Sequence, residues 1–280
     1  VDAVKDLALN NGMVVPDDDR MLPAQRAEHT AKTLALSEVM TKACEYYRGQ
    51  LRGSERAIQY LKGRGLTGEI AARFGLGYAP DAWDSLRSVF VDYQDPALAE
   101  SGMVIDKSDD AGAHRKRYDR FRDRVMFPIR NTKGQVIGFG GRILDQGEPK
   151  YLNSPETPLY QKGLELYGLF EARQAIRDAG YVLVTEGYMD VVALAQLGFP
   201  QAVATLGTAC TPTHVQKLLR QTDQVIFSFD GDAAGRRAAR RALDACLSQV
   251  NDSKVIKFLF LPVEHDPDSY VRAYGAEAFE

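Results

Sequence analysis

The sequence Val225-Ile226-Phe227-Ser228-Phe229-Asp230-Gly231-Asp232 joins an apolar run to two aspartates that flank a glycine. A short apolar run closed by glycine is typical of a buried strand and its exit turn. In an open parallel sheet, ligands bind just beyond the carboxyl ends of the strands. Two carboxylates at such a place repel each other unless a cation holds them together. The stretch therefore predicts a strand end that carries a metal site.

A second predicted strand end has the same composition. Val182–Thr185 runs directly into Glu186–Asp190, so an acid–glycine turn again follows an apolar run. The two acids of that turn are four residues apart, which would place them on one face of a helix start. Asp266 and Asp268 follow a further predicted strand. Because hard oxygen ligands select Mg²⁺ or Mn²⁺ rather than zinc, we expect one shared site for phosphate chemistry.

Acids that follow a strand also have a simpler use. An aspartate side chain caps a helix by accepting hydrogen bonds from its first N–H groups, and for any single acid this is the better interpretation. Acids at three strand ends of one small sheet favour the metal site instead, because like charges would gather there. Asp266 and Asp268 are the weakest candidates, since one of them is also placed to cap the last helix.

The chain after Glu165 alternates predicted strands and helices with short turns between them. We expect strands over 181–185, 201–205, 224–229 and 254–261, and helices over 168–178, 190–197, 212–221, 233–249 and from about 268. Such alternation indicates a parallel sheet covered by helices. We therefore divide the chain near residue 164, into a mixed α+β part (1–164) and a compact α/β domain (165–280).

The first part mixes helical and β-like patterns. Helices are expected over 1–15, 30–49, 54–62, 67–74 and 83–92. The apolar segments 125–129 and 136–139 are joined through Asn131–Gly134, which predicts a β-hairpin.

The overall composition narrows the class of protein. The 280 residues carry a net charge of -3, and 26% are charged, as in ordinary soluble proteins. Cys44, Cys210 and Cys246 form no CxxC pair, which argues against zinc in this chain and fits a reducing cytosol. No apolar run approaches the roughly 20 residues that span a bilayer. We therefore expect a cytoplasmic protein without membrane contact, and a monomer, because no long coiled-coil pattern is present.

The small net charge conceals a basic stretch. Between Ala113 and Arg142, nine Lys or Arg residues stand against two Asp residues, a net charge of +7. A charge run of this kind is equally typical of a solvated surface. Next to an acidic metal site, however, a basic surface is what a polynucleotide-handling enzyme requires, because it neutralises backbone phosphates.

Several of these motifs resemble those of known protein families. Glu186–Asp190 with Asp230–Asp232 resembles the TOPRIM fold shared by topoisomerases, some nucleases and bacterial primases. Three longer strings closely resemble the polymerase core of bacterial DnaG-type primases, namely Tyr118–Ile129, Gly138–Arg142 and Pro149–Thr157. The resemblance covers the chain from about Glu38 to Tyr270. It implies a TOPRIM parallel-sheet α/β domain preceded by a mixed α+β N-terminal subdomain.

The resemblance also implies a role for each matched residue. Glu186, Asp230 and Asp232 would coordinate the catalytic metals, Mg²⁺ or Mn²⁺. Asp190 and Asp268 match further acids that support the site. The residues that match nucleotide- or nucleic-acid-binding positions are Arg142, Lys150, Tyr151, Asn153, Lys162 and, less closely, Arg64.

The activity implied is that of a DNA-directed RNA polymerase. It would synthesise short RNA primers on single-stranded DNA from ribonucleoside triphosphates, by metal-ion nucleotidyl transfer. Primases of this type also carry an N-terminal zinc-binding module and a C-terminal domain that contacts the replicative helicase. The ligands of the first and the sequence of the second are not recognisable here. We therefore expect a catalytic fragment without zinc, whose helicase contact depends on a domain outside this sequence.

Two other functions remain open from the sequence. A TOPRIM nuclease would use the same metals with water as the nucleophile and would release nucleotides or nicked strands. A non-catalytic nucleic-acid-binding module could keep the acids as a structural metal site. The strings around Arg142 and Lys150 count against the nuclease, and the complete set of acids counts against the binding module.

Overall fold

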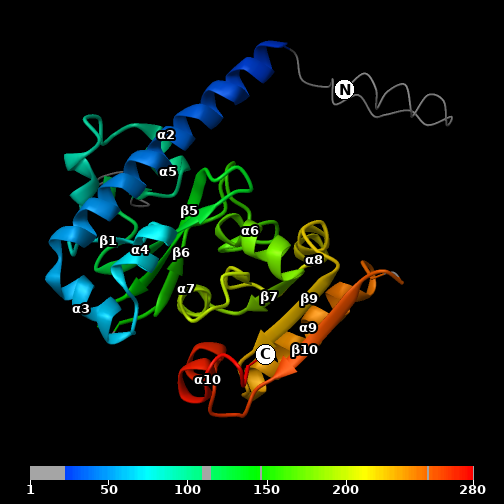
Figure 1. Cartoon of the computed structure of the whole chain (residues 1–280). Helices are drawn as coiled ribbons and strands as arrows, with labels where there is room; N and C mark the ends of the chain where they lie inside the picture. Colours follow the sequence, from blue (N-terminus) through cyan, green and yellow to red (C-terminus); the bar gives the residue numbers. More distant parts are fainter. Residues whose placement is uncertain (1–22, 109–114, 146, 251, 280) are drawn as a thin grey trace. The chain divides into compact units, whose positions relative to one another are not determined.

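The computed structural model describes residues 23–108, 115–145, 147–250 and 252–279. These residues fall into two units, which divide after Ala35. The second unit contains every element described below except the start of helix α2 (Pro23–Gly53) (Figure 1). The helix expected over 1–15 lies outside the described residues. Within the described ranges, no helix has both the length and the apolarity that a membrane span requires.

Helices and antiparallel strands make up the part of the chain before residue 164. After α2, its elements are α3 (Glu55–Gly63), α4 (Gly68–Phe74), β1 (Gly77–Ala79), the 3-10 helix η1 (Ser85–Ser88), α5 (Pro96–Glu100), β2 (Val104–Ser108), β3 (Arg115–Asp119), β4 (Arg124–Arg130), β5 (Val136–Ile143) and β6 (Tyr151–Asn153). Four strands form an antiparallel sheet in the order β1-β4-β5-β6, and β2 pairs with β3 in a separate hairpin. This is the mixed architecture expected from the sequence.

Local signals explain several of these elements. Ser54 and Thr67 cap α3 and α4, and each side chain accepts a hydrogen bond of 3.3 Å from the backbone N–H three residues ahead. The hairpin between β4 and β5 is confirmed. In its turn Gly134 has φ of +84°, a left-handed conformation that glycine adopts without steric cost.

The helix expected over 83–92 is wrong, because only the four residues of η1 are helical there. The segment instead wraps around the buried carboxylate of Asp119, at the end of β3. That carboxylate accepts hydrogen bonds from the Ser85 hydroxyl (2.7 Å), the Leu86 N–H (2.9 Å) and the Tyr93 hydroxyl (2.6 Å). Asp119, which is distant in sequence, thus accepts hydrogen bonds from this segment and favours a non-helical path for it.

The part of the chain after residue 164 alternates strictly. Its elements are α6 (Leu169–Ala179), β7 (Tyr181–Thr185), α7 (Tyr188–Gln196), β8 (Ala202–Ala204), α8 (Pro212–Leu219), β9 (Gln224–Phe229), α9 (Ala233–Leu247), β10 (Val255–Phe260) and α10 (Pro267–Tyr274). The strands form a parallel sheet in the order β10-β9-β7-β8. The expected parallel sheet is therefore confirmed.

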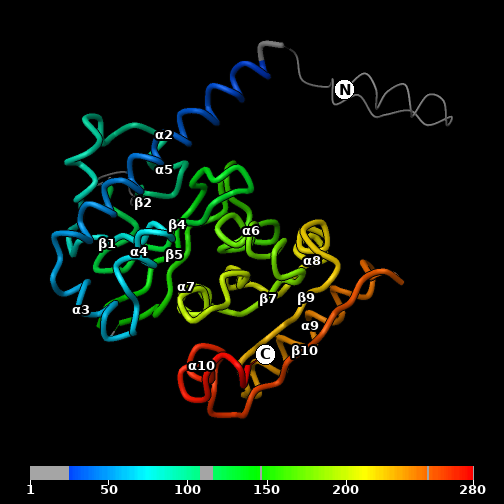
Figure 2. The backbone as a smooth tube through the Cα atoms, viewed as in Figure 1, coloured from blue at the N-terminus to red at the C-terminus, as the bar shows by residue number. Residues whose placement is uncertain are grey.

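Helices cover both faces of this sheet. One face packs Val184 and Phe227 against side chains of α6, α8 and α9, whereas the other packs Leu183 and Ile226 with residues of α7 and α10. The alternation follows from the two-residue period of a strand. The backbone path in Figure 2 shows α9 running beside β9 and β10, with which it is in contact.

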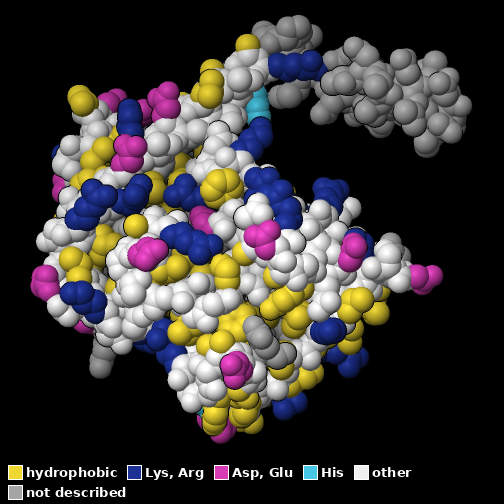
Figure 3. All heavy atoms as spheres, in the orientation of Figure 1, with side chains coloured by type: hydrophobic (Ala, Val, Ile, Leu, Met, Phe, Trp, Pro, Cys, Tyr) yellow, Lys and Arg dark blue, Asp and Glu magenta, His cyan; other side chains and the backbone are white. Residues whose placement is uncertain are grey.

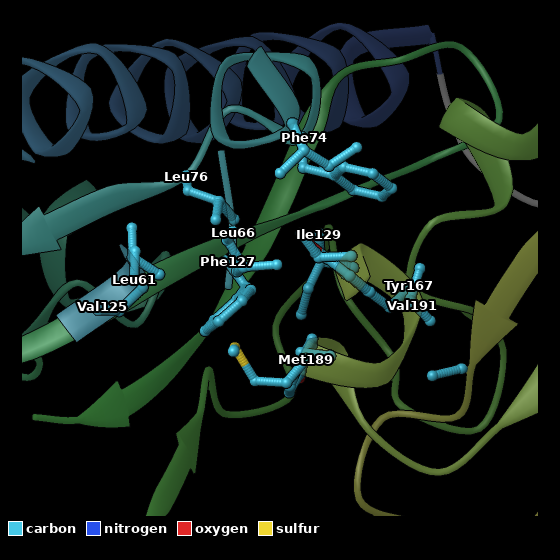
Figure 4. Packing of buried hydrophobic residues seen from close by; sticks show 14 of the residues in the cluster. Leu61, Leu66, Phe74, Leu76, Val125, Phe127, Ile129, Tyr167, Met189 and Val191 are labelled. Atoms are coloured by element: carbon cyan, nitrogen blue, oxygen red, sulfur yellow. The ribbon is translucent and has the colours of Figure 1, made fainter. Parts of the chain in front are cut away.

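One core cluster joins residues from before and after residue 164. Figure 4 shows Phe127 and Ile129 of β4 near Tyr167, Met189 and Val191, all of which belong to this cluster. The packing fixes β4–β6 against the start of α7, which begins two residues after Glu186. The domain boundary near residue 164 stays a prediction, and the core runs continuously across it.

Candidate functional site

The carboxyl ends of two neighbouring strands bring the first acids together. Glu186 directly follows β7, and Asp230 directly follows β9, the adjacent parallel strand. In the register of these strands, Val184 lies opposite Phe227. Parallel strands end at the same edge of the sheet, so both carboxylates project from one edge, where ligands bind in open α/β sheets.

A close backbone approach brings the loop after β10 to the same edge. The Gly231 N–H donates to the His265 carbonyl at 3.1 Å. A Cβ atom at position 231 would lie 2.0 Å from the Pro262 carbonyl oxygen, so only glycine fits here. This approach places Asp266 and Asp268, at the start of α10, beside the ends of β7 and β9. We call the six carboxylates Glu186, Asp190, Asp230, Asp232, Asp266 and Asp268 the acid edge.

The pKa values show how closely the acid edge is assembled. Burial raises the pKa of Asp190 to about 8, and the charges of Asp266, Asp230 and Asp268 add to the shift. Burial likewise raises the pKa of Asp230 to about 6, with further contributions from Glu186, Asp266 and Asp232. The pKa of Glu186 is raised mainly by burial, and Asp232 adds to the shift. Each acid therefore opposes ionisation of its neighbours.

Four of the six acids also hold local structure. Asp190 accepts from the Gly187 N–H at 3.1 Å, and Asp232 caps α9 by accepting from a backbone N–H at 2.8 Å. Asp266 caps α10 with a hydrogen bond of 2.7 Å, and Asp268 pairs with Arg272 at 2.6 Å on the same helix. The capping role considered from the sequence is thus real, and it coexists with the gathering of charge.

Glu186 is the member whose hydrogen bonding is incomplete. Among the described residues, its Oε1 atom is buried without a hydrogen-bond partner. A buried carboxylate oxygen left in this way is costly, and a bound cation would satisfy it. In the described part of the chain, no three His, Cys, Asp or Glu side chains are arranged so that they could hold a metal ion together. The acid edge supplies oxygen donors of the kind that a hard cation prefers, but they do not form a ligand cage.

Alternating guanidinium groups and tyrosine rings lie next to these acids. Arg64 and Arg142 each lie 5.8 Å from the centroid of the Tyr60 ring, and Arg142 lies 5.0 Å from that of Tyr151. Arg142 is only 7% exposed, and its Nε donates to the Tyr60 hydroxyl. We call Arg64, Tyr60, Arg142 and Tyr151 the guanidinium–tyrosine stack. Its contacts are cation–π interactions supported by a charge-assisted hydrogen bond.

Electrostatic effects connect the stack to the acid edge. Burial raises the pKa of Tyr151, Arg142 opposes the shift, and Asp190 adds to it. Burial raises the pKa of Asp268, which Arg272 and Arg64 lower. The structure therefore brings Arg64, Arg142 and Tyr151 into the same region as the acids.

The remaining basic and polar candidates lie in different surroundings. Asn153 donates to the Leu206 carbonyl at 2.9 Å and accepts from the Tyr188 hydroxyl at 2.8 Å, so it ties β6 to α7 and to the segment after β8. Lys150 is exposed just before β6, and Lys162 is half-buried in the segment before α6. No contact places these two lysines directly on the acid edge within the described residues.

Part of the basic stretch before Arg142 is used inside the protein. Arg124 is 6% exposed and donates to the Pro149 carbonyl at 2.9 Å, while Arg117 pairs with Asp106 at 2.8 Å. On the face shown in Figure 3, Lys and Arg side chains lie in several separate groups rather than in one continuous patch. Lys116 and Lys133 of the stretch are exposed, so the charge excess is divided between internal contacts and the surface.

Sequence reasoning missed two residues of the site. Tyr60 carries no motif, and only its position between two guanidinium groups reveals it. Arg241 lines a cavity of about 230 Å³ together with Glu186, Thr205 and Thr208, and its charge lowers the pKa of Glu186. Among the four arginines of α9, nothing in the sequence singled it out.

Comparison with known proteins shows which family the chain resembles. Residues 46–173 match the DNA primase catalytic core, N-terminal domain, and residues 183–271 match a Toprim-like domain. The chain is 55% identical over 283 residues to a DNA primase of Neisseria meningitidis, covering 100% of this chain and 47% of the relative. It therefore spans about half the length of this curated relative. Toprim domains of primases are generally metal-dependent.

Two solved structures are similar in fold as well as in sequence. A crystal structure of a DNA primase domain from Pseudomonas aeruginosa is 53% identical with a TM-score of 0.81, covering 87% of this chain and 76% of that one. A structure of the DnaG primase catalytic domain bound to ssDNA is 46% identical with a TM-score of 0.81, covering 89% of this chain and 78% of that one. By sequence, fold and the joining of its two domains, this chain belongs to the DnaG primase family.

Proposed function

We propose that this chain is the catalytic core of a primase, a DNA-directed RNA polymerase that synthesises short RNA primers on single-stranded DNA. The observation that carries the proposal is that the acid edge and the guanidinium–tyrosine stack lie next to each other in one site. Burial raises the pKa of Tyr151, and the charge of Asp190 in the acid edge adds to the shift. The Tyr151 ring also lies against the buried guanidinium of Arg142. Nucleotidyl transfer needs acidic and basic groups together, because basic groups must hold the phosphates beside carboxylates that bind cations.

We assign the metal-ligand role to Glu186, Asp230 and Asp232, with Asp190 and Asp268 as supporting acids. Carboxylate oxygens are the ligands that Mg²⁺ and Mn²⁺ prefer, and the unpartnered Oε1 of Glu186 would gain a partner. When bound, such ions would activate a 3′-hydroxyl and stabilise the charge that develops on the leaving pyrophosphate. The chain's own contribution is to fix these oxygens at the ends of rigid strands.

The basic residues would hold the phosphates. Arg142 is already oriented by Tyr60 and Tyr151, so little side-chain entropy is lost when it meets a phosphate. Lys150 and Lys162 carry mobile point charges that would offset phosphate charge, and Arg64 would extend the basic surface toward α10. Asn153 retains one amide N–H and one oxygen lone pair for a nucleotide after its contacts with the chain.

The partners follow from the same proposal. They are a single-stranded DNA template, ribonucleoside triphosphates and a replicative helicase. The related DnaG catalytic domain bound to ssDNA supports the template assignment. Binding to the template should weaken as salt rises, because phosphate contacts release counterions. We place the protein in the cytoplasm, where replication takes place.

Primer synthesis by this chain tests the proposal directly. Labelled ribonucleotides, single-stranded DNA and Mg²⁺ or Mn²⁺ are supplied to the wild type, to Asp230→Ala and to Asp244→Ala. Asp244 is the matched control, because it lies on α9 with its side chain 63% exposed and is not part of the acid edge. We expect metal-dependent RNA products from the wild type and from Asp244→Ala only. DNA breakdown would indicate a nuclease, and DNA binding without turnover would indicate a non-catalytic module.

A further inference from the structure

The segment that carries Lys162 is attached to the start of helix α8 by three contacts. The His214 Nε2 lies 3.0 Å from the Lys162 carbonyl oxygen. The Thr211 hydroxyl donates to the Gly163 carbonyl at 2.8 Å, and the Lys217 ammonium pairs with Glu165 at 3.0 Å. Three side chains within two turns of one helix thus hold positions 162, 163 and 165 of the Lys162 segment.

His214 occupies the centre of this attachment. It is completely buried, and both of its ring nitrogens have partners. The Thr211 N–H lies 3.2 Å from Nδ1, which must accept because a backbone N–H can only donate. The Lys162 carbonyl can only accept, so Nε2 must carry the proton. The ring is therefore neutral, with its single proton on Nε2, and it uses one nitrogen for the helix and the other for the Lys162 segment.

Helix α8 also adjoins the acid edge. Cys210 and Glu186 line the same cavity, and the next residue after Cys210 is Thr211, the N-cap of α8. The stretch 205–210 connects the end of β8 to that cap along the cavity wall. His214 therefore ties the backbone of Lys162 to the element that borders Glu186. Nothing in the proposed chemistry assigns a role to His214 or Thr211.

We propose that His214 is a positioning residue, which holds the Lys162 backbone against α8 so that the Lys162 ammonium is presented to a nucleotide phosphate. The inference rests on the proposed function, because it takes Lys162 as a phosphate contact. Lys162 is half-buried, and its own N–H lies 3.3 Å from Glu156. Its backbone is thus fixed on both sides while its side chain remains available. Loss of the His214 contact would release the carbonyl and let the ammonium move away.

Two substitutions at His214 test the contacts of Nδ1 and Nε2 separately. In His214→Asn the amide can replace Nδ1, so the helix cap is kept and the contact with Lys162 is lost. In His214→Gln the amide reaches the position of Nε2, so the contact with Lys162 is kept. We measure binding of ATP with Mg²⁺ by fluorescence titration, KM and kcat for primer synthesis, and the thermal midpoint of each variant. We expect His214→Asn to raise the Kd and KM by about 10-fold with little change in kcat, the loss of roughly one well-made hydrogen bond. For His214→Gln, the Kd and KM should lie much closer to the wild-type values.

A double-mutant cycle with Lys162→Ala completes the test. If His214 acts through Lys162, the double variant binds ATP no more weakly than Lys162→Ala alone. Losses that multiply instead would overturn the proposal, because His214 would then act independently of Lys162. Equal ATP binding by Lys162→Ala and the wild type, with primers still made, would overturn it while leaving the primase function intact. No ATP binding and no primers from the folded wild type would reject the function, and the positioning role with it.

A gentler variant covers the case in which His214→Asn does not fold. Lys217→Met removes only the ion pair with Glu165, at the rim of the same attachment. We expect it to raise the KM by about 2-fold, as befits a partly exposed ion pair, and to lose that effect in the Lys162→Ala background. Persistence of the effect in that background would contradict the proposal.

Discussion

The acid edge and the guanidinium–tyrosine stack are adjacent, but they are stabilised in opposite ways. In the acid edge, burial and the neighbouring carboxylates raise the pKa values of Asp190 and Asp230, and one Glu186 oxygen is buried without a partner among the described residues. In the stack, Arg142 is buried, but tyrosine rings and a hydroxyl surround its guanidinium. Within the described residues, the acids thus have few positive partners, mainly Arg272 beside Asp268 and Arg241 near Glu186, whereas the contacts of Arg142 are made within the chain. The stack is therefore held in place by its own contacts, and the acid edge keeps a net excess of negative charge.

The largest expected effect comes from removing the unpartnered acid. We expect Glu186→Gln to reduce metal-dependent primer synthesis by at least about 100-fold, as for other losses of electrostatic stabilisation. Its thermal midpoint without metal should be unchanged or higher, because one repelling charge is removed. Primer assays and thermal melts with and without Mg²⁺ measure both quantities. A lower midpoint in the absence of metal would show that Glu186 is a structural residue, contrary to the comparison drawn here.

The next effect concerns the backbone contact that assembles the acid edge. Gly231→Ala would place a Cβ atom 2.0 Å from the Pro262 carbonyl, so the loop after β10 must move away. We expect a loss of about 3 kcal/mol of unfolding free energy, typical of forced overpacking, together with weaker Mn²⁺ binding. Gly68→Ala, at a site where a Cβ meets nothing within 4 Å and where φ, as at Gly231, is not positive, is the control for adding a methyl group without the clash. Equal losses in the two variants would mean that the contact with Pro262 has no importance of its own.

The acid edge also predicts a pH dependence that the stack does not share. The folded-state pKa of Asp190 is raised to about 8 and that of Asp230 to about 6, so between pH 4 and 8 these two carboxyls bind more protons in the folded chain than in the unfolded chain. Their contribution to the unfolding free energy without metal should therefore fall as pH rises through this window. Chemical denaturation at several pH values measures the slope. Mg²⁺ should flatten it, and so should Asp230→Asn. A rise in stability over the same window would contradict the repulsion inferred here.

The smallest expected effect tests the stack. Arg142→Lys keeps the charge but loses the planar group that lies on two tyrosine rings. We expect a loss of about 1 kcal/mol of unfolding free energy, and a several-fold weaker affinity for single-stranded DNA. Arg240→Lys on α9 is the control, because that guanidinium is 80% exposed. Identical DNA affinities for the wild type and Arg142→Lys would indicate that charge alone matters at this position.

The secondary structure predicted from the sequence was more accurate after Glu165 than before it. Every strand and helix expected after Glu165 is present, because short apolar runs and acid–glycine turns are local signals. Before that residue the caps at Ser54 and Thr67 and the β4–β5 hairpin were predictable for the same reason. The helix over 83–92 was not, since its donors bind Asp119 from a distant strand. The roles assigned to the site residues stay predictions.

The sequence by itself determined the parallel sheet, the strand ends that carry the acids and the family to which the chain belongs. These depend on residue periodicity and on motifs contiguous in the chain. Only the tertiary structure decided that Arg142 is buried against Tyr60, that Asn153 ties β6 to α7, and that His214 ties the Lys162 segment to α8. Each of these contacts joins residues between 35 and 82 positions apart. Such contacts form only when the chain packs, so no local pattern records them.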